Sequence, residues 1–300
     1  MSRKIVPALE GRTIRCILFD LGSTLWTDNE SFDYLAQQHI VQQRMLAIIR
    51  KYISPRFFPG TDDTMLEEQI SQAIRQRVYQ MYIQNTRLEP DFATAVVEAL
   101  QQVGLLRVDR SVGAEIFEAL RTRSYGSRVL FEDSLTTLAT LKQRGFLLGV
   151  VTNREYGGPL FIEDMRDFGL LDYFEVPHIA ISADLNVRKP SPIIFRYALD
   201  ALDVPPEEAV MVGDSLGADI VGAKELNMGA VWKPNQQVFA QARTAQEQKQ
   251  STQTFESMLI ELARRYEQSR GRPIPRDIMP DLIIEHQREL LDVFVEVGKQ

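Results

Sequence analysis

The sequence predicts an α/β fold, a doubly wound parallel sheet with an inserted all-helical domain. Two patterns along the 300 residues support this prediction. Over residues 128–233, short apolar runs alternate with helical segments, as strands and helices alternate in a parallel sheet. Residues 29–125 instead show helical periodicity and no convincing strand. We therefore expect an α/β core formed by residues 1–28 and 126–300, with a separate helical domain between these two segments.

The strands of the core sheet are expected at six short apolar runs. Each run is brief and bounded by turn signals, which favours buried strands over helices. The runs lie at residues 14–19, 146–151, 179–181, 209–213, 229–232 and 281–284. In an open parallel sheet, ligands bind outside the carboxyl ends of the strands. Asp20, Thr152 and Asp214 each follow a run directly, so we expect them at one edge of the sheet.

Three amphipathic segments are expected in the helical domain. Asp91 precedes the third segment as an N-cap, and Gly104 follows it as a C-terminal stop. Apolar residues at helical spacing give each segment one face to bury. These faces carry Phe32, Leu35, Ile40 and Val41 in the first segment, Leu66, Ile70, Ala73, Ile74 and Met81 in the second, and Phe92, Val96, Ala99, Leu100 and Val103 in the third.

A second helical signal interrupts the core. Residues 234–279 are rich in Gln and poor in strand signals, and we expect them to form an insertion. One helix is evident within it, because apolar residues recur at the 3.6-residue spacing at Phe255, Met258, Leu259, Leu262 and Tyr266. The sequence does not indicate what this insertion does.

Composition and charge narrow the class of protein. Hydrophobic residues make up 44% and charged residues 25%, proportions that allow a sizeable buried core. A net charge of -7 and a pI near 5.2 argue against a nucleic-acid groove, which needs a basic face. No apolar run approaches the ~18 residues of a membrane span. The single cysteine, Cys16, lies in an apolar run and indicates a core residue in a reducing compartment. We therefore expect a cytoplasmic protein without nucleic-acid or membrane partners.

The first chemical motif follows the first predicted strand and reads Asp20-Leu21-Gly22-Ser23-Thr24. A carboxylate at a strand end can serve as a nucleophile or as a metal ligand. It can equally be the N-capping end of a buried strand. The pattern also resembles the phosphate loop of sugar kinases, Hsp70 proteins and actins, but the second glycine-rich loop of those proteins is absent from the sequence. This motif alone leaves its chemistry open.

Two further motifs carry polar or charged groups. Thr152 and Asn153 offer a hydroxyl and an amide at the end of the second strand. Lys189 precedes Pro190, and the residue before a proline is pushed out of the α region, so this lysine is not in a helix interior. Each motif alone also fits a simple turn or a surface charge.

The fourth motif spans Gly213-Asp214-Ser215-Leu216-Gly217-Ala218-Asp219. Two carboxylates at this spacing on a strand-to-loop turn suit a hard cation. The same letters spell the motif of GDSL esterases, which place the serine near the N-terminus and follow it with Asp-x-x-His. Asp281 and His286 have the wrong spacing for that class, so we reject it.

Together and in this order, the four motifs resemble those of the haloacid dehalogenase-like (HAD) superfamily. The resemblance covers about residues 12–28 and 128–233, and residues 280–294 resemble the last strand and helix of the family. It implies a Rossmann-like core. It also places residues 29–125 where members with a helical cap carry that cap.

The resemblance implies a Mg²⁺-dependent phosphohydrolase that acts on a small phosphorylated metabolite. It implies that Asp20 attacks phosphorus to form an aspartyl-phosphate, and that Thr152 and Lys189 bind the phosphoryl oxygens. Asp219 would also orient Lys189 or a metal-bound water. The implied metal ligands are Asp20, Asp214, Asp219 and the backbone carbonyl of Gly22, and the implied substrate contacts come from Ser23, Thr24 and Asn153.

Gly22 departs from the pattern of the resemblance. Phosphatases of the family carry an aspartate at this position as general acid and base, and loss of a general acid costs ~10²–10⁴ in rate. A backbone metal ligand would survive the change. Ser23 is a poor substitute acid, and Asp28 is distant along the chain. A slow enzyme fits this sequence, and so does an inactive homologue that binds a phosphorylated ligand or a protein.

Two other classes in the same superfamily also lack that aspartate. Phosphonate-cleaving enzymes use a cap lysine for a Schiff base, and Lys51 is the only lysine between the first motif and residue 141. Dehalogenases need no metal, whereas the presence of both Asp214 and Asp219 favours Mg²⁺. The phosphohydrolase interpretation is therefore preferred.

Overall fold

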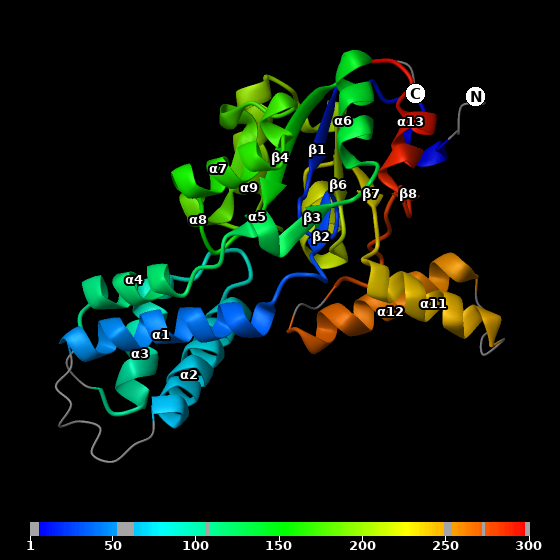
Figure 1. The fold of residues 1–300 in the computed structure, drawn as a ribbon. Coiled ribbons are helices and arrows are strands. Elements are labelled where there is room, and N and C mark those ends of the chain that lie inside the picture. The colour runs from blue at the N-terminus through cyan, green and yellow to red at the C-terminus, as the bar shows by residue number, and fades with distance from the viewer. Residues whose placement is uncertain (1–5, 53–62, 106–107, 249–253, 272–273, 298–300) are drawn as a thin grey trace. The chain divides into compact units, whose positions relative to one another are not determined.

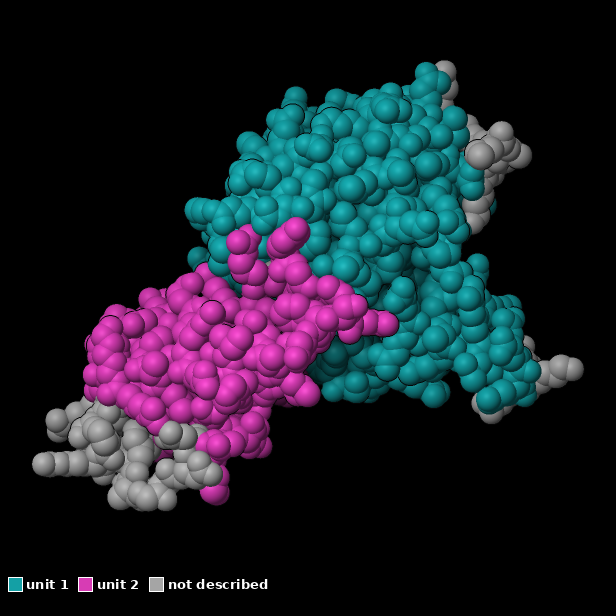
Figure 2. Space-filling view, viewed as in Figure 1, with its two compact units in different colours: residues 1–28, 128–300 teal, residues 29–127 magenta. Residues whose placement is uncertain are grey.

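The computed structural model describes residues 6–52, 63–105, 108–248, 254–271 and 274–297. The chain divides into two compact units, residues 1–28 with 128–300 and residues 29–127 (Figure 2). Each unit is described by itself below. Within the described ranges, no helix has both the length and the apolar character needed to cross a bilayer.

The first unit is built on a six-stranded sheet in the order β5-β4-β1-β6-β7-β8 (Figure 1). All neighbouring strands in this sheet are parallel. The strands are β1 (Cys16–Phe19), β4 (Leu147–Thr152), β5 (Ile179–Ile181), β6 (Ala209–Gly213), β7 (Gly229–Trp232) and β8 (Leu282–Ile283). The predicted doubly wound α/β fold is confirmed.

The strands are buried on both faces, as expected of a parallel sheet between helices. On β1, Ile17 and Phe19 belong to one hydrophobic cluster, and Cys16 and Leu18 belong to the other. Because both faces are apolar, the strand has no polar alternation and was recognisable only as a short apolar run. Burial raises the pKa of the Cys16 thiol to about 12, so this cysteine is a core residue, as predicted.

Helices cover both faces of the sheet. Helices α6 (Ser134–Gln143), α7 (Gly158–Asp167) and α13 (Leu290–Val293) contribute buried side chains to the first cluster. Helices α9 (Pro192–Leu202) and α10 (Val221–Glu225) contribute to the second. The remaining short elements are α8 (Ser182–Leu185), 3-10 turns at Pro7–Leu9, Leu170–Asp172, Val176–His178, Pro206–Glu208 and Gln287–Glu289, and a π-helical turn at Leu216–Ile220.

The 234–279 insertion contains two helices, α11 (Gln236–Glu247) and α12 (Phe255–Ser269). Only α12 was predicted from the sequence, because α11 has few apolar residues among its glutamines. Both helices are part of the core: Val238, Ala242, Met258, Leu259, Ile260 and Ala263 lie in the same cluster as Met211 and Trp232. Residues 249–253 and 272–273 of the insertion lie outside the described residues.

A short antiparallel ribbon was not predicted. It pairs β2 (Trp26–Asp28) with β3 (Arg128–Leu130). Three residues in each strand are too few for a pattern of alternation to be visible in the sequence. The ribbon is held by buried Trp26 and by an ion pair between Arg128 and Asp28 at 2.7 Å.

The second unit is helical in its described residues. It contains α1 (Tyr34–Tyr52), α2 (Asp63–Gln84), α3 (Phe92–Gln102), α4 (Arg110–Ala119) and the short α5 (Ser124–Ser127). Asp91 caps α3 as predicted, since its side chain accepts a hydrogen bond from the backbone N–H of Thr94. Residues of α1 to α4 form one hydrophobic cluster that includes Met45, Ile49, Ile70, Val96, Leu100 and Ile116.

The predicted apolar face of the first helix is partly wrong. Leu35 is 80% exposed and Ile40 is 42% exposed. The buried face of α1 begins at Val41 and continues through Met45, Leu46 and Ile49. The N-terminal turns of α1 therefore extend beyond the cluster, which the spacing of apolar residues alone does not reveal.

Candidate active site

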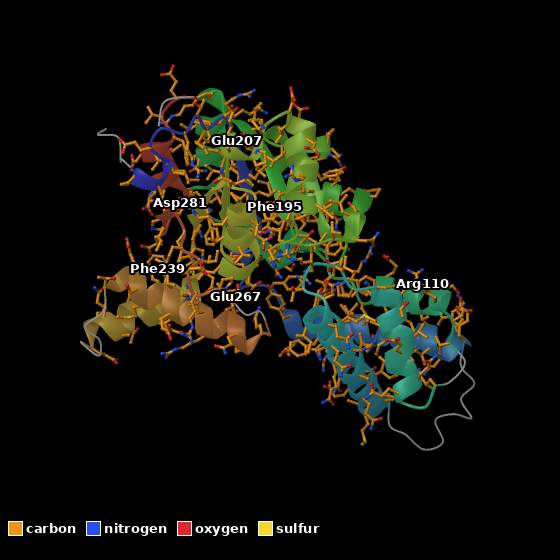
Figure 3. The ribbon with its side chains drawn as sticks, turned by 180° about the vertical axis from the view of Figure 1, so that it is seen from behind. Arg110, Phe195, Glu207, Phe239, Glu267 and Asp281 are labelled. Atoms are coloured by element: carbon orange, nitrogen blue, oxygen red, sulfur yellow. The ribbon has the colours of Figure 1, made fainter. Side chains whose placement is uncertain are left out.

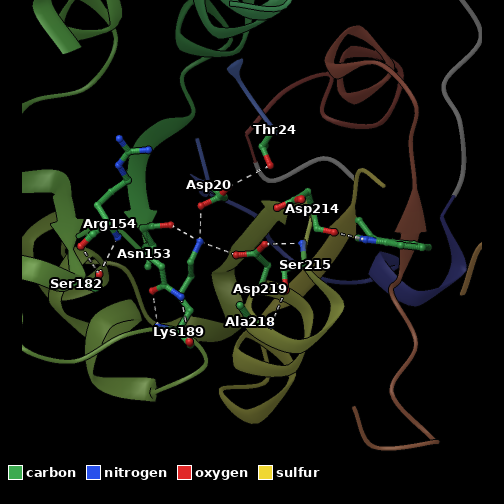
Figure 4. A network of polar contacts seen from close by, with 12 residues as sticks. Asp20, Thr24, Asn153, Arg154, Ser182, Lys189, Asp214, Ser215, Ala218 and Asp219 are labelled. Atoms are coloured by element: carbon green, nitrogen blue, oxygen red, sulfur yellow. Dashed lines mark hydrogen bonds and ion pairs between the residues drawn. The ribbon is translucent and has the colours of Figure 1, made fainter. Parts of the chain in front are cut away.

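The candidate site lies at the carboxyl edge of the three central strands (Figure 4). Asp20 follows β1, Thr152 ends β4 and Asp214 follows β6. Because β1 pairs with both β4 and β6, the ends of these strands are direct neighbours. The topology thus brings together three residues that are distant in the sequence.

Lys189 is the buried cation of this edge. Its ammonium lies 2.6 Å from Asp20 Oδ1 and 2.6 Å from Asp219 Oδ1, and it donates a 2.7 Å hydrogen bond to the carbonyl of Val151. The Lys189 side chain is 2% exposed. Burial acts to lower the pKa of this amine, but the charges of Asp20 and Asp219 outweigh burial and raise the pKa above its ordinary value. Lys189 is therefore a fixed positive charge beside Asp20.

Asn153 forms two hydrogen bonds with the backbone of Lys189. Asn153 Oδ1 accepts a 2.8 Å hydrogen bond from the backbone N–H of Lys189, and Asn153 Nδ2 donates a 3.1 Å bond to its carbonyl. This pair of bonds joins the end of β4 to the loop between α8 and α9. The geometry gives Asn153 a positioning contact with Lys189, and the substrate contact expected from the sequence stays a prediction.

The loop after β6 is fixed by bonds within the loop and to β7. Asp219 Oδ2 accepts a 2.9 Å hydrogen bond from the backbone N–H of Ser215, and Ser215 Oγ accepts one of 3.1 Å from the N–H of Ala218. The indole N–H of Trp232 donates a 2.7 Å bond to the carbonyl of Asp214. These contacts set the direction in which the two carboxylates of the loop point.

Asp20, Asp214 and Asp219 form an acidic cluster. One carboxylate oxygen of each lies within 4.8 Å of the others. Burial, followed by the charges of Asp20 and Asp219, raises the pKa of Asp214 well above its usual range. Burial also raises the pKa of Asp219 to about 6, although Lys189 opposes this shift. Lys189 and, through its interaction with Asp214, Lys233 are the cations near these three carboxylates, so negative charge is still in excess.

This donor set fits Mg²⁺. The cluster offers oxygen ligands alone, which is what a hard cation prefers. Repulsion among Asp20, Asp214 and Asp219 would be relieved by a divalent cation, which is also consistent with the raised pKa of Asp214. Asp219 has a second role in the structure, because its 2.6 Å ion pair with Lys189 orients that lysine, as the resemblance implied.

Two side chains that the sequence did not single out donate hydrogen bonds to the backbone of the loop after Asp20. Lys233 Nζ donates a 2.9 Å hydrogen bond to the carbonyl of Ser23, whose φ of 54° lies in the left-handed region. Gln287 Nε2 donates to the carbonyl of Thr24. Lys233 follows β7 directly, so its place after a predicted strand was the signal that could have identified it. Gln287 gave no such signal.

The two predicted substrate contacts in this loop differ in accessibility. Thr24 is fully buried, and its hydroxyl donates a 3.5 Å hydrogen bond to Asp20 Oδ2. This contact holds the Asp20 carboxylate, and the substrate contact expected of Thr24 stays a prediction. Ser23 is half-buried, and its backbone is the part that is engaged.

Gly22 is not required by the backbone. Its φ lies outside the left-handed region, and a Cβ added there would approach only Asp20 Oδ2, at 3.9 Å. A Cβ at this position therefore has space and would lie beside the Asp20 carboxylate.

Comparison with known proteins identifies the family. The family model for haloacid dehalogenase-like hydrolases matches residues 14–227. Over 290 residues the chain is 26% identical to a glyceraldehyde 3-phosphate phosphatase from Methanopyrus kandleri, covering 95% of this chain and 99% of the relative. Over 97 residues it is 45% identical to a glyceraldehyde 3-phosphate phosphatase from Pyrococcus furiosus, covering 32% of this chain and 38% of that relative.

Other relatives and solved structures agree with this assignment. A phosphoserine phosphatase from Thermus thermophilus is 36% identical over 136 residues, which cover 45% of this chain and 51% of the relative. A HAD phosphatase from Thermococcus onnurineus shares the fold, with a TM-score of 0.53, 23% identity, and coverage of 95% of this chain and 100% of that one. The family match over most of the core, together with the observed topology, shows that this chain is a hydrolase of the haloacid dehalogenase-like superfamily.

Proposed function

We propose that this protein is a Mg²⁺-dependent phosphohydrolase that acts on a small phosphorylated metabolite through an aspartyl-phosphate at Asp20. The observation that carries the proposal is the buried Asp20–Lys189–Asp219 arrangement at the carboxyl edge of the sheet. It presents one carboxylate beside a fixed cation, at the edge where ligands of parallel sheets bind.

Asp20 would act as the nucleophile. A carboxylate oxygen of Asp20 forms a bond to phosphorus while the bond between phosphorus and the leaving oxygen breaks. Water then attacks the phosphorus of the aspartyl-phosphate, which releases inorganic phosphate and restores the Asp20 carboxylate. Lys189 holds the Asp20 carboxylate in position before the first step, because its ammonium lies 2.6 Å from Oδ1.

Charge on the transferred group is offset by residues already present in the site. Lys189 and Thr152 would bind phosphoryl oxygens, the lysine through its ammonium and the threonine through its hydroxyl. Asp20, Asp214, Asp219 and the carbonyl of Gly22 would hold Mg²⁺, whose charge further offsets that of the phosphoryl oxygens when it is bound.

The absence of a carboxylate at residue 22 predicts a dependence on the leaving group. With no general acid there, the leaving oxygen is not protonated as it departs. An alkoxide is a poor leaving group without that proton, whereas an aryl oxide departs more readily without it. We therefore expect slower turnover of alkyl phosphates than of aryl phosphates. An inactive homologue that binds phosphorylated ligands or proteins is the second candidate, and Gly22 is the observation that favours it.

The substrate class follows from the relatives. Proteins named for glyceraldehyde 3-phosphate and phosphoserine suggest small phosphate monoesters as the first compounds to test. The helical unit, residues 29–127, is proposed to be the cap that selects among them. A cytoplasmic location without nucleic-acid partners also remains a proposal, supported by the net charge of -7.

A phosphonate-cleaving activity is disfavoured. The Schiff base of that class needs a lysine that is neutral near pH 7. Lys51 forms a 3.2 Å ion pair with Glu115, and its hydrogen bonds with Tyr52 and to Glu115 raise the pKa of its amine. A raised pKa keeps Lys51 protonated and unreactive toward a carbonyl.

A direct assay tests the proposed function. Phosphate release from glyceraldehyde 3-phosphate, phosphoserine and p-nitrophenyl phosphate is measured with and without Mg²⁺, for the wild-type protein and for Asp20→Asn. We expect release that requires both Mg²⁺ and Asp20. Release by Asp20→Asn at the wild-type rate would exclude Asp20 as the nucleophile, and no release from any phosphomonoester would favour the inactive homologue.

A further inference from the structure

A carboxylate of the insertion reaches the loop that carries Asp214. Glu267 lies in the last turn of α12 (Figure 3) and is 5% exposed. Ser215, the residue after Asp214, donates a hydrogen bond from its hydroxyl to Glu267 Oε1. Residues separated by 52 positions in the sequence are thus joined next to the acidic cluster.

The contact is built into the packing of the insertion. Four residues of α12 are buried in the same hydrophobic cluster as Met211 of β6: Met258, Leu259, Ile260 and Ala263. A Cβ on Gly217 would lie 3.7 Å from Glu267 Oε2, which is ordinary van der Waals contact. Glu267 is therefore carried to its place by a docked helix.

Glu267 places a further acidic group near Asp214. A buried carboxylate loses its hydration. The C-terminal turn of a helix has a partial negative charge and disfavours acidic side chains. Glu267 also adds repulsion to Asp214, whose pKa is already raised by burial, Asp20 and Asp219. A divalent cation bound at Asp214 would therefore also be attracted by the charge of Glu267.

The hydrogen bond also acts on geometry. Ser215 Oγ accepts from the N–H of Ala218, and the Ser215 N–H donates to Asp219 Oδ2 at 2.9 Å. Ser215 is therefore the centre of the loop that directs Asp214 and Asp219. Glu267 Oε1 accepts the hydrogen bond that the Ser215 hydroxyl donates, and this bond fixes the rotamer of Ser215.

We propose that Glu267 is a positioning residue for the metal site: through Ser215 it fixes the loop of Asp214 and Asp219, and its charge strengthens Mg²⁺ binding. The inference rests on the proposed function. It assigns the 234–279 insertion a role, which is to complete the metal site from outside the family's four motifs. Affinity for hard cations rises with the number of carboxylate charges around the site.

The test separates the charge of Glu267 from its hydrogen bond. Glu267→Gln keeps an oxygen that accepts from Ser215 and removes the charge, whereas Glu267→Ala removes both. Glu261→Gln is the matched control, because Glu261 lies on the same helix in an exposed 2.9 Å pair with Arg265. Mg²⁺ dissociation constants are measured by calorimetry, and melting temperatures are measured in metal-free protein.

In Glu267→Gln, Mg²⁺ affinity should fall without a fall in the metal-free melting temperature. We expect Mg²⁺ to bind about 10-fold more weakly, the order of effect for one nearby charge in a partly buried site. The metal-free melting temperature should stay the same or rise, because repulsion with Asp214 is removed. Glu267→Ala should bind Mg²⁺ more weakly still, and Glu261→Gln should match the wild-type protein in both readouts.

Other outcomes contradict the inference. Unchanged Mg²⁺ affinity in both Glu267 variants would leave Glu267 a structural residue and overturn the inference, with the proposed function intact. A lower metal-free melting temperature in Glu267→Gln at unchanged affinity would do the same. If wild-type protein binds no Mg²⁺, the proposed metal dependence fails, and this inference fails with it.

A second variant keeps the test valid if Glu267 variants fold poorly. Ser215→Ala removes the same hydrogen bond from the loop side, so it should also weaken Mg²⁺ binding. Combined with Glu267→Ala, its effect should be less than additive, as expected for residues in direct contact. Strict additivity would show that the two residues act independently and would overturn the positioning role.

Discussion

At the scale of single residues, the site is set by one buried lysine among carboxylates. Lys189 contacts Asp20 and Asp219 at 2.6 Å each, and its ammonium holds both in place. Asp214 has no such partner within 4 Å among the described ion pairs, and its pKa is raised well above the usual range, first by burial. Asp214 is thus the carboxylate with most to gain from a cation.

The role of Asp214 is tested by its neutral isostere. Mg²⁺ should raise the melting temperature of the wild-type protein, because a ligand that binds the native state stabilises it by about 2.7 kcal/mol at 100 times its dissociation constant. Asp214→Asn should abolish this shift. In metal-free protein near neutral pH, the same variant should melt at a higher temperature, because a buried repulsive charge is removed. An undiminished Mg²⁺ shift in the variant would place the metal elsewhere.

Gly22 is the residue at which a gain of activity is expected. Gly22→Asp restores a carboxylate two residues after the nucleophile, and the structure has space for its Cβ. The gain could reach ~10²-fold on alkyl phosphates and should be smaller on aryl phosphates, whose leaving groups need less protonation. Steady-state assays on both substrate types measure it. Equal losses on both, with a lower melting temperature, would show that the loop does not accept the side chain.

The residues of the four motifs could be identified from the sequence, but the residues outside the motifs that contact them could not. Asp20, Lys189 and Asp219 were expected near one another from motif order, and the structure brings them into contact. Lys233 was not singled out although it directly follows a predicted strand, and Glu267 was not expected because a single glutamate on a helix has no distinguishing pattern. Their contacts depend on how β7 and α12 pack, which local sequence does not encode.

At the scale of elements, the end of β4 and the Lys189 loop act together. Asn153 joins them through two hydrogen bonds to the Lys189 backbone. Because the Lys189 ammonium lies beside Asp20, a shift of this loop should affect the rate of turnover more than the stability of the fold.

Asn153→Ala tests this link. The two lost hydrogen bonds should cost about 1–3 kcal/mol of stability, and the displacement of Lys189 from Asp20 should lower kcat/KM by roughly 10-fold or more. Thermal melting and steady-state kinetics on an aryl phosphate measure the two effects. A large loss of stability with unchanged kcat/KM would make Asn153 a purely structural residue.

Elements with strong apolar patterns were predicted well, and weakly patterned elements were not. Strands β5, β6 and β7 occur at the predicted residues because they are continuous apolar runs between turns. The ribbon of β2 and β3 is too short to leave a pattern, and α11 is stabilised by a few buried residues such as Val238 and Ala242. Tertiary packing, and not local periodicity, determines these elements.

At the scale of the whole molecule, the fold concentrates buried negative charge at one edge of the sheet, and stability should report it. The pKa of Asp219 is raised to about 6 and that of Asp214 is raised further above its ordinary value, in both cases first by burial. A carboxylate whose pKa is raised on folding binds its proton more tightly in the native state, so stability falls as pH rises from the unfolded to the folded pKa.

The resulting prediction concerns metal-free protein. Its melting temperature should fall as the pH rises from about 4; the part due to Asp219 ends above about pH 6, the part due to Asp214 continues at higher pH, and Asp214→Asn should show a shallower fall. Saturating Mg²⁺ should remove most of the decline, because the cation binds the ionised carboxylates. Melting curves over this pH range measure the slope. A wild-type slope that matches the slope of Asp214→Asn would show that Asp214 is ionised normally.

The sequence predicted the class of the molecule because motif order and strand order reflect the same topology. An open parallel sheet places every strand end at one edge, so four separate motifs had to converge. The role of the insertion was hidden, since it depends on which loop α12 contacts. The assignment of residues 29–127 as a substrate-selecting cap stays a prediction.

The central claim is that Asp20 becomes phosphorylated during turnover, and chemical trapping tests it most directly. Protein mixed with p-nitrophenyl phosphate and Mg²⁺ is quenched in acid within the first turnover and digested, and the peptide containing Asp20 is examined by mass spectrometry. We predict one added phosphoryl group on that peptide, absent without Mg²⁺ and absent in Asp20→Asn. Phosphate release at the full rate with no phosphoryl group on Asp20, or with the group on another residue, would contradict the account.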